Sequence, residues 1–268
     1  MGTAIGLGVA ARGALERVHA WLFPPACRAC GGLLAPPGFA ALAPGYPHLC
    51  GACHAGLPWR QTPPRFDPGP LAWLDSATHY ARPVDGWIQH LKYQRRLGVV
   101  RLLGRLLAES PAGAAALRDA PWVVPVPLHP RRLWGRGFNQ SLLLAHAWLR
   151  AAAGKSDPTG GGLAGGGLAG GSAPGTPGAA SPRLAADVLV RHRYTRPQVS
   201  VSAVERRTNV LGAFSLHPRL AGIAAPLAGR SVVLVDDVAT TGATLHACAQ
   251  VLREAGAERV RALVVAHG

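Results

Sequence analysis

The strongest chemical signal in the chain is a pair of adjacent carboxylates followed by a short run of small and hydroxyl side chains. The pair, Asp236 and Asp237, comes directly after the apolar sequence Val-Val-Leu-Val at residues 232–235, and residues 238–244 read Val-Ala-Thr-Thr-Gly-Ala-Thr. Carboxylates accept hydrogen bonds from neighbouring hydroxyl groups or hold a hydrated Mg²⁺. Backbone N–H groups at the start of a helix favour a phosphate dianion. The segment therefore predicts a site for a sugar phosphate, and ribose 5-phosphate fits it.

The elements expected around these residues explain why the two kinds of group would meet. An uninterrupted apolar run is typical of a central strand in a parallel sheet that helices cover on both faces, and ligands bind beyond the carboxyl ends of such strands. We therefore expect a buried strand at residues 232–235, with both aspartates at its end contacting the sugar. An ordinary helix cap is the alternative, since Asp and Thr are good capping residues. The residues expected to bind the phosphate are Val238, Ala239, Thr240, Thr241, Gly242, Ala243 and Thr244.

Residues 232–244 resemble the signature of the type I phosphoribosyltransferases, which is an apolar strand, two acidic residues and a Thr/Gly/Ser-rich phosphate loop. The resemblance covers all thirteen positions. It implies the parallel-sheet α/β fold of those enzymes and a site for phosphoribosyl pyrophosphate with Mg²⁺. Asp236 and Asp237 would then be catalytic residues that hold the ribose.

A second candidate anion site follows a buried strand expected at residues 122–126. Residues 127–140 contain Arg131, Arg132 and Arg136 with two glycines, in what we expect to be a basic loop that leads into a helix. Guanidinium groups match the geometry of phosphate oxygens. The three arginines would bind the pyrophosphate, and Arg136 would act with the aspartates in catalysis as the pyrophosphate departs. A surface arginine cluster is the alternative.

Apolar periodicity predicts the remaining elements of an α/β domain. Residues 71–80 are expected to form a strand, residues 84–93 a helix that resumes at residues 98–107, and residues 187–191 a further strand. Lys92 lies near the end of the first helical segment. Its side chain would approach the pyrophosphate, bind an acceptor or lie on a solvated helix face.

Four of the five cysteines form two pairs with metal-ligand spacing. Cys27 and Cys30 make one Cys-x2-Cys knuckle, Cys50 and Cys53 make the other, and nineteen residues separate the two. Four thiolates complete the tetrahedral coordination of Zn²⁺, so the metal would be structural. Two disulfides are the alternative, which no secretory feature of the sequence favours.

Three further side chains near these motifs have less specific interpretations. His48 and His54 flank the second knuckle and could replace a cysteine as ligand, but we expect them to be exposed loop residues. Cys248 lies in the helix expected after the phosphate loop, where it would be a small buried apolar residue.

Length and composition bound the organisation of the chain. A chain of 268 residues with 49% hydrophobic content can bury one core of ordinary domain size beside a small module. We expect an N-terminal helix at residues 1–22, a zinc-ribbon module at 23–60 and a phosphoribosyltransferase-like domain at 71–268. Residues 154–182 consist mainly of Gly, Ala, Pro and Ser, so we expect a disordered insertion there.

The charge balance indicates the kinds of partner. The formal net charge is +15, which favours binding of polyanions such as single-stranded DNA or attraction of phosphorylated substrates, although compositional bias toward arginine is the blander explanation. No apolar stretch approaches the roughly 20 residues that cross a bilayer. We therefore expect a cytoplasmic protein without membrane insertion.

A polar segment before residue 214 lacks a clean period and carries several arginines, as expected of a mobile lid. Such a lid would exclude water from the site. The side chains expected to close over the ligand are Arg193, Thr195, Gln198, Arg206 and Asn209.

The order of the motifs along nearly the whole chain is similar to that of the ComF family, the ComFC/GntX-like competence proteins of bacteria. The resemblance implies a protein that binds phosphoribosyl pyrophosphate and assists uptake of transforming single-stranded DNA together with DNA-uptake proteins. An active phosphoribosyltransferase of nucleotide salvage or base metabolism, with an acceptor that no motif identifies, is the alternative. The motifs are the two knuckles, Leu22-Phe23-Pro24, Leu91-Lys92-Tyr93, Val124-Pro125-Val126-Pro127, Arg136-Gly137-Phe138-Asn139-Gln140, Thr195-x2-Gln198, Arg206-x2-Asn209-Val210 and residues 232–244.

Overall fold

The computed structural model divides the chain into two compact units, Met1–Leu57 and Pro58–Gly268. The predicted N-terminal helix up to residue 21, residues 155–181 of the Gly-rich insertion and lid residues 195–209 lie outside the described residues. The residues that the structure describes are 22, 26–34, 42–43, 46–61, 69–119, 122–154, 182–194, 210, 212–220 and 222–268.

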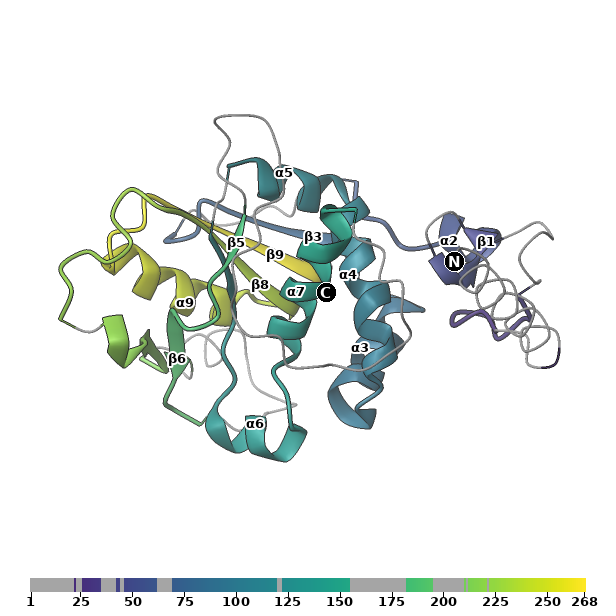
Figure 1. Cartoon of the computed structure of the whole chain (residues 1–268), viewed down its shortest axis with the longest axis horizontal. Coiled ribbons are helices and arrows are strands. Elements are labelled where there is room, and N and C mark those ends of the chain that lie inside the picture. Colours follow the sequence, from purple (N-terminus) through teal and green to yellow (C-terminus); the bar gives the residue numbers. More distant parts are fainter. Residues whose placement is uncertain are drawn as a thin grey trace, which may run out of the picture. The chain divides into compact units, whose positions relative to one another are not determined.

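The larger unit is built on a five-stranded sheet in the order β3-β9-β8-β4-β5, in which every neighbouring pair is parallel (Figure 1). This arrangement confirms the predicted α/β class and the strands predicted around residues 71–80 and 122–126. The strands are β3 (Trp73–His79), β4 (Trp122–Pro125), β5 (Arg183–Leu184), β8 (Ser231–Ala239) and β9 (Arg259–His267).

Different elements cover the two faces of this sheet (Figure 1). On one face lie α4 (Val100–Glu109), α5 (Pro111–Asp119) and α7 (Gln140–Ala152). On the other lies α9 (Ala243–Glu254), which packs on alternate residues of β8 and β9 and on a small hairpin. The hairpin consists of β6 (Leu189–Arg191) and β7 (Phe214–Leu216), paired antiparallel.

The central strand β8 forms because its first half is apolar on both faces. The four residues 232–235 are all fully buried, as the sequence predicts. The strand nevertheless continues to Ala239, which pairs with His267 of β9, whereas pairing with β4 ends where Pro125 lies opposite Val235. The prediction that the two aspartates follow the strand is therefore wrong in detail. They lie within β8, just beyond the point where β4 leaves it.

The helical layer beside β3 confirms one predicted apolar face. The expected side chains of α4 and of the preceding 3-10 turn η1 (Leu97–Val99) are buried: Val99, Leu102, Leu103, Leu106 and Leu107. The helix α3 (Val84–Gln94), also predicted, precedes them. The alanine-rich α5 has no predicted counterpart, because its apolar residues are too small to give a clear hydrophobic period.

The basic segment after β4 differs from its prediction. Residues predicted as a loop form a short helix, α6 (Pro130–Arg136). Pro130 suits the first helical turn, the His129 ring accepts a hydrogen bond from the Arg131 N–H at 3.1 Å, and Gly137 ends the helix at φ 88°. The arginines therefore project from a helix instead of a flexible loop.

The smaller unit contains β1 (Leu42–Ala43) and β2 (Tyr46–Cys50), paired antiparallel, and the short helix α2 (Gly51–Ala55). His48 is exposed on β2, but His54 is partly buried on α2, with its ring centre 4.6 Å from that of Tyr46. The prediction that both histidines are exposed loop residues is therefore wrong. Among the described residues of the chain, no helix has the length and apolarity needed to span a membrane.

We expect Gly104→Ala in α4 to lower the free energy of unfolding by about 1–3 kcal/mol, because it overpacks a close contact between helices. A Cβ at this position would lie 2.5 Å from the Ala147 Cβ and 2.7 Å from the Ala147 carbonyl carbon of α7. Urea denaturation measures the change. The matched control is Gly86→Ala in α3, where nothing lies within 4 Å of the added carbon. An equal loss in both variants would contradict the close approach of α4 and α7.

Candidate functional site

The strand order places a topological switch point at the carboxyl ends of β4 and β8, which is where open α/β sheets form a ligand crevice. These two strands are neighbours, but the chain leaves β4 toward β5 on one side and leaves β8 through α9 toward β9 on the other. The connections therefore diverge, and the carboxyl ends of the two strands border the kind of crevice in which open α/β sheets bind ligands. Both candidate anion-binding segments, residues 127–140 and 238–244, begin at this crevice.

Asp237 is buried and forms an ion pair with a lysine. Only 3% of Asp237 is exposed, and its Oδ1 lies 2.8 Å from the Nζ of Lys92 on α3. Burial lowers the pKa of Lys92, but the carboxylate of Asp237, helped by that of Asp236, outweighs burial and leaves the pKa above its ordinary value. Lys92 therefore remains charged and does not lie on a freely solvated helix face. Within the described residues, the buried Oδ2 of Asp237 has no hydrogen-bond partner.

Asp236 lies in a different environment. Its Oδ1 accepts hydrogen bonds from the Ser141 hydroxyl at 2.7 Å and from the Asp237 N–H at 2.9 Å. Desolvation and then the neighbouring carboxylate of Asp237 raise the pKa of Asp236 to about 7, although Ser141 and Lys92 oppose the rise. Near neutral pH this carboxyl can therefore either donate or accept a hydrogen bond. A cation or hydroxyl groups placed beside it would favour its charged form.

Ser141 reaches Asp236 because the start of α7 is fixed to the end of β4. The Asn139 side chain caps α7 by accepting a hydrogen bond from the Ser141 N–H at 3.0 Å, and it donates another to the Val126 carbonyl at 3.1 Å. The Asn-Gln-Ser sequence at the helix start was a usable signal for this cap. The sequence contains no signal that Ser141 would contact Asp236 on β8.

The turn after β8 presents a helix start toward the crevice. Gly242 precedes α9 at φ 68°, a backbone conformation that glycine adopts without strain, and the Thr241 Oγ1 accepts a hydrogen bond from the Ala243 N–H at 3.4 Å. Thr240 is exposed and Thr241 and Thr244 are partly exposed. Of the other predicted phosphate-binding residues, Val238 is partly exposed, whereas Ala239, Gly242 and Ala243 are buried. The hydroxyls and backbone N–H groups of this turn could hold an anion.

The predicted arginines divide into two groups. The guanidinium carbons of Arg131 and Arg132 lie 5.8 and 5.7 Å from the ring centre of Tyr194, a residue that also contacts the His129 ring. Arg136 instead donates a hydrogen bond to the Gln140 side chain at 2.5 Å. The structure thus gathers two of the three arginines on one aromatic ring and directs the third toward the start of α7.

Arg191 is a site residue that the sequence reading did not identify. It lies on β6, is only 8% exposed, and its guanidinium carbon is 5.1 Å from the Phe214 ring centre. Burial lowers the pKa of Arg191, the like charge of Arg132 lowers it further, and Asp236 opposes the change. An arginine remains charged despite such effects. Arg191 therefore adds a buried positive charge within electrostatic reach of both Arg132 and Asp236.

The thiol of Cys248, also on the α9 side of the sheet, is fully buried as predicted. Burial raises the pKa of this thiol well above its ordinary value. Cys248 therefore acts as a small apolar residue of the core.

The smaller unit brings its four cysteines together. All four are free thiols, and their Sγ atoms lie within 4.8 Å of one another. Burial raises the pKa of Cys27, but hydrogen bonds from the backbone around Cys30 and Cys50 outweigh it and lower the value to about 6. A hydrogen bond with Cys50 and the other thiols raise the pKa of Cys53 to about 12. The cluster could bind a metal ion such as zinc, whose charge would hold four thiolates together.

Comparisons with known proteins agree with these features. A sequence profile of the phosphoribosyl transferase domain matches residues 186–268. DNA utilization protein YhgH of Escherichia coli strain K12 is 32% identical over 79% of this chain and 79% of its own. Competence protein F of Haemophilus influenzae is 31% identical over 68% of this chain and 67% of its own.

Among solved structures, the chain is similar to the glutamine phosphoribosylpyrophosphate amidotransferase from B. subtilis complexed with ADP and GMP. The identity is 20% and the TM-score is 0.36. The match covers 66% of this chain and 30% of the amidotransferase chain.

We expect Asp236→Asn to stabilise the ligand-free protein at pH 8 but not at pH 4. Between pH 4 and 7 an unfolded chain releases the Asp236 proton while the folded chain retains it, because the folded pKa is about 7 against an ordinary value of 3.8. The free energy of unfolding that this carboxyl contributes therefore falls as pH rises through that window. The free energy of unfolding of the variant, relative to that of the parent, should therefore rise by roughly 1–4 kcal/mol between pH 4 and pH 8.

Urea denaturation at the two pH values measures this difference. Asp187→Asn is the control, since its side chain is 65% exposed and its carboxylate lies 3.9 Å from the Arg219 guanidinium, a long contact. A gain that is the same at pH 4 and pH 8, or that the control reproduces, would contradict the desolvation of Asp236.

Proposed function

The chain belongs to the family of DNA utilization protein YhgH and competence protein F, and from this we propose that it binds phosphoribosyl pyrophosphate with Mg²⁺ and assists the use of incoming single-stranded DNA in the cytoplasm. The phosphoribosyl transferase profile over residues 186–268 supports the first part, and the names of the relatives support the second. The observation that carries the proposal is the position of Asp236 and Asp237 near the end of β8, which leads into α9, with the buried Arg191 within electrostatic reach of Asp236.

Each chemical part of the ligand has a matching group in the crevice. The carboxyl of Asp236 would accept hydrogen bonds from the ribose hydroxyls, because repulsion excludes it from the phosphates. The 5-phosphate would lie against the first turn of α9, where Thr241 and Thr244 supply hydroxyls beside the N–H groups. Arg132 and Arg191 would face the pyrophosphate, with Arg131 beside them.

The residues present fit a Mg²⁺ ion bound with this ligand. The Oδ2 of Asp237 is buried and lacks a partner within the described residues, and desolvation holds the pKa of Asp236 near 7 until positive charge arrives. When bound, Mg²⁺ supplies positive charge to the pyrophosphate oxygens. Lys92 would hold the Asp237 carboxylate in place through their ion pair at 2.8 Å, and Asp236, which has no cationic partner at that distance among the described residues, would respond to the ligand.

The cysteine cluster supports a structural role for zinc in the smaller unit. Four thiolates at Zn–S distances of about 2.3 Å leave no coordination position for water or substrate. The metal would therefore hold the knuckles around Cys27 and Cys50 together and take no part in the chemistry of the crevice.

Calorimetric titration with phosphoribosyl pyrophosphate and Mg²⁺ tests the main proposal. We expect the parent to bind, and Asp236→Asn to weaken binding about 10- to 100-fold, because the variant loses charge-assisted hydrogen bonds to the ribose while its fold is retained. Asp187→Asn, which removes the same charge from an exposed side chain that contacts Arg219, should bind as the parent does. Absence of binding in the parent, or equal affinity in all three proteins, would refute the assignment. Pyrophosphate release with a panel of bases would separate transfer from binding.

Metal analysis of the purified chain tests the zinc proposal. We expect about one zinc ion per chain, and its loss in Cys30→Ser, because three thiolates with one hydroxyl hold zinc far less tightly. Cys30 is exposed, so the substitution leaves the packing of the core intact. Cys248→Ala is the control, since this thiol lies outside the cluster. A zinc content that does not change in Cys30→Ser would overturn the four-cysteine site.

A further inference from the structure

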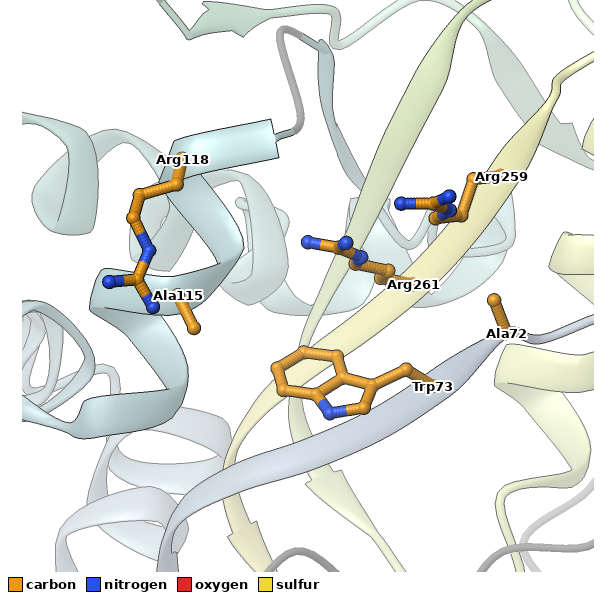
Figure 2. Close-up of a pocket in the computed structure, with 6 residues that line it drawn as sticks. All are labelled: Ala72, Trp73, Ala115, Arg118, Arg259 and Arg261. Atoms are coloured by element: carbon orange, nitrogen blue, oxygen red, sulfur yellow. The ribbon is translucent and has the colours of Figure 1, made fainter.

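A basic hollow lies at the amino ends of β3 and β9, at the opposite end of the strands from the crevice (Figure 2). It has a volume of about 350 Å³. Its lining combines three arginines, one tryptophan and two alanines: Arg118, Arg259, Arg261, Trp73, Ala72 and Ala115. A cavity of this size accommodates a small ligand or one unit of a polymer.

The register of the sheet explains why these side chains meet. Trp73 of β3 lies directly opposite Arg261 of β9, and Arg259 lies two residues earlier on the same face of its strand. The residues between and after them, Val260 and Ala262, are fully buried on the other face, against α9. The arginines are therefore placed on the α5 side by the same alternation that builds the core.

The hollow exists because its helical cover is thin. α5 contributes alanines where it packs on the sheet, with Ala112 and Ala116 buried and Ala115 lining the hollow. Arg118 extends from the last turn of the same helix. In Figure 2 the guanidinium groups of Arg259 and Arg261 point toward the side where Arg118 lies, and the Trp73 indole extends into the same space.

The positive charges of the three arginines favour an anionic ligand in this hollow. Arg118 and Arg259 are exposed, and within the described residues neither forms an ion pair with an acidic side chain. Guanidinium groups gathered around one space repel each other unless an anion lies between them. The guanidinium fork matches the oxygens of phosphate and of carboxylate, and the tryptophan adds a flat surface on which a nucleobase can stack, which favours a nucleotide phosphate.

We propose that this hollow, formed by Trp73, Arg118, Arg259 and Arg261, binds a nucleotide unit of single-stranded DNA, with the base on the indole and the phosphates on the guanidinium groups. A free inorganic anion would use the arginines but not the tryptophan. The exposed arginines leave the hollow open, so that a strand can pass through it. The net charge of +15 would draw such a strand to the surface.

This site is separate from the crevice that we propose for phosphoribosyl pyrophosphate. Arg259 lies opposite Ser231 at the start of β8, five residues before Asp236. That interval corresponds to about 17 Å along the strand. The inference rests on the proposed use of DNA, but it does not rest on the binding of phosphoribosyl pyrophosphate, so the two can fail independently.

The test measures binding of a fluorescent fifteen-residue oligothymidylate by anisotropy at several salt concentrations. In Arg118→Gln with Arg259→Gln we expect weaker binding and a salt slope, log Kd against log salt, that is smaller by about 1.4, because two phosphate contacts are lost. The control is Arg101→Gln with Arg219→Gln, which removes the same charge from exposed sites elsewhere and should leave the slope unchanged.

Trp73→Leu tests the stacking contact, with an expected loss of affinity of about 5- to 100-fold. The proposal would be overturned if the Arg118/Arg259 variant kept the affinity and salt slope of the parent. It would also be overturned if the Arg101/Arg219 control lost as much affinity as the Arg118/Arg259 variant. Either result holds whatever Trp73→Leu shows. Deoxythymidine monophosphate binding as tightly as the oligonucleotide would also overturn it, in favour of a free nucleotide. Calorimetry with phosphoribosyl pyrophosphate should give the parent affinity in the Arg118/Arg259 variant. Failure of the parent to bind that ligand would refute the proposed function of the crevice and leave the DNA result standing.

Discussion

Two adjacent carboxylates held within one buried strand impose the main physical constraint on the larger unit. Charges at such a position repel each other and lose hydration, so each needs its own compensation. Asp237 obtains it from Lys92 of α3, and Asp236 obtains part of it from the hydroxyl of Ser141 at the start of α7. These contacts join α3 and α7 to the central strand of the sheet. The incomplete compensation of Asp236 is the part that a ligand can complete.

The crevice is preorganised because its groups belong to regular elements. Arg191 is held on a strand against Phe214, and the arginines that the sequence places in a loop are carried by α6, whose start is capped by His129. Positive groups fixed in this way need little rearrangement when an anion arrives. This crevice lies at the carboxyl ends of the strands, whereas the arginines at the start of β9 lie at the amino ends. One sheet could therefore hold a small phosphorylated ligand at one end of its strands and a polyanion at the other.

The sequence predicted the central elements well where their residues have strong patterns. The buried strand at residues 232–235 and the apolar face of α4 were evident, because large apolar residues recur with the periods of strand and helix. Elements whose apolar residues are small or few were not predicted correctly. α5 is built mainly from alanines, and a loop is predicted at α6 because glycines and arginines obscure its seven helical residues, which make about two turns. His54 was expected to be exposed, since a contact such as that with Tyr46 has no signature in sequence.

The sequence by itself determined the chemical groups of this protein: which residues are acids, hydroxyls, arginines and thiols, and the short spacings that make a hydroxyl-rich turn and two cysteine knuckles. These properties are local, because they depend on residues that are covalently close. The tertiary structure alone decided the partners of those residues. It paired Lys92 with Asp237, brought Ser141 to Asp236 across 95 positions, and placed Trp73 opposite Arg261. Such contacts depend on strand order and helix packing, which bring together residues whose separation in the chain carries no information about their distance in space.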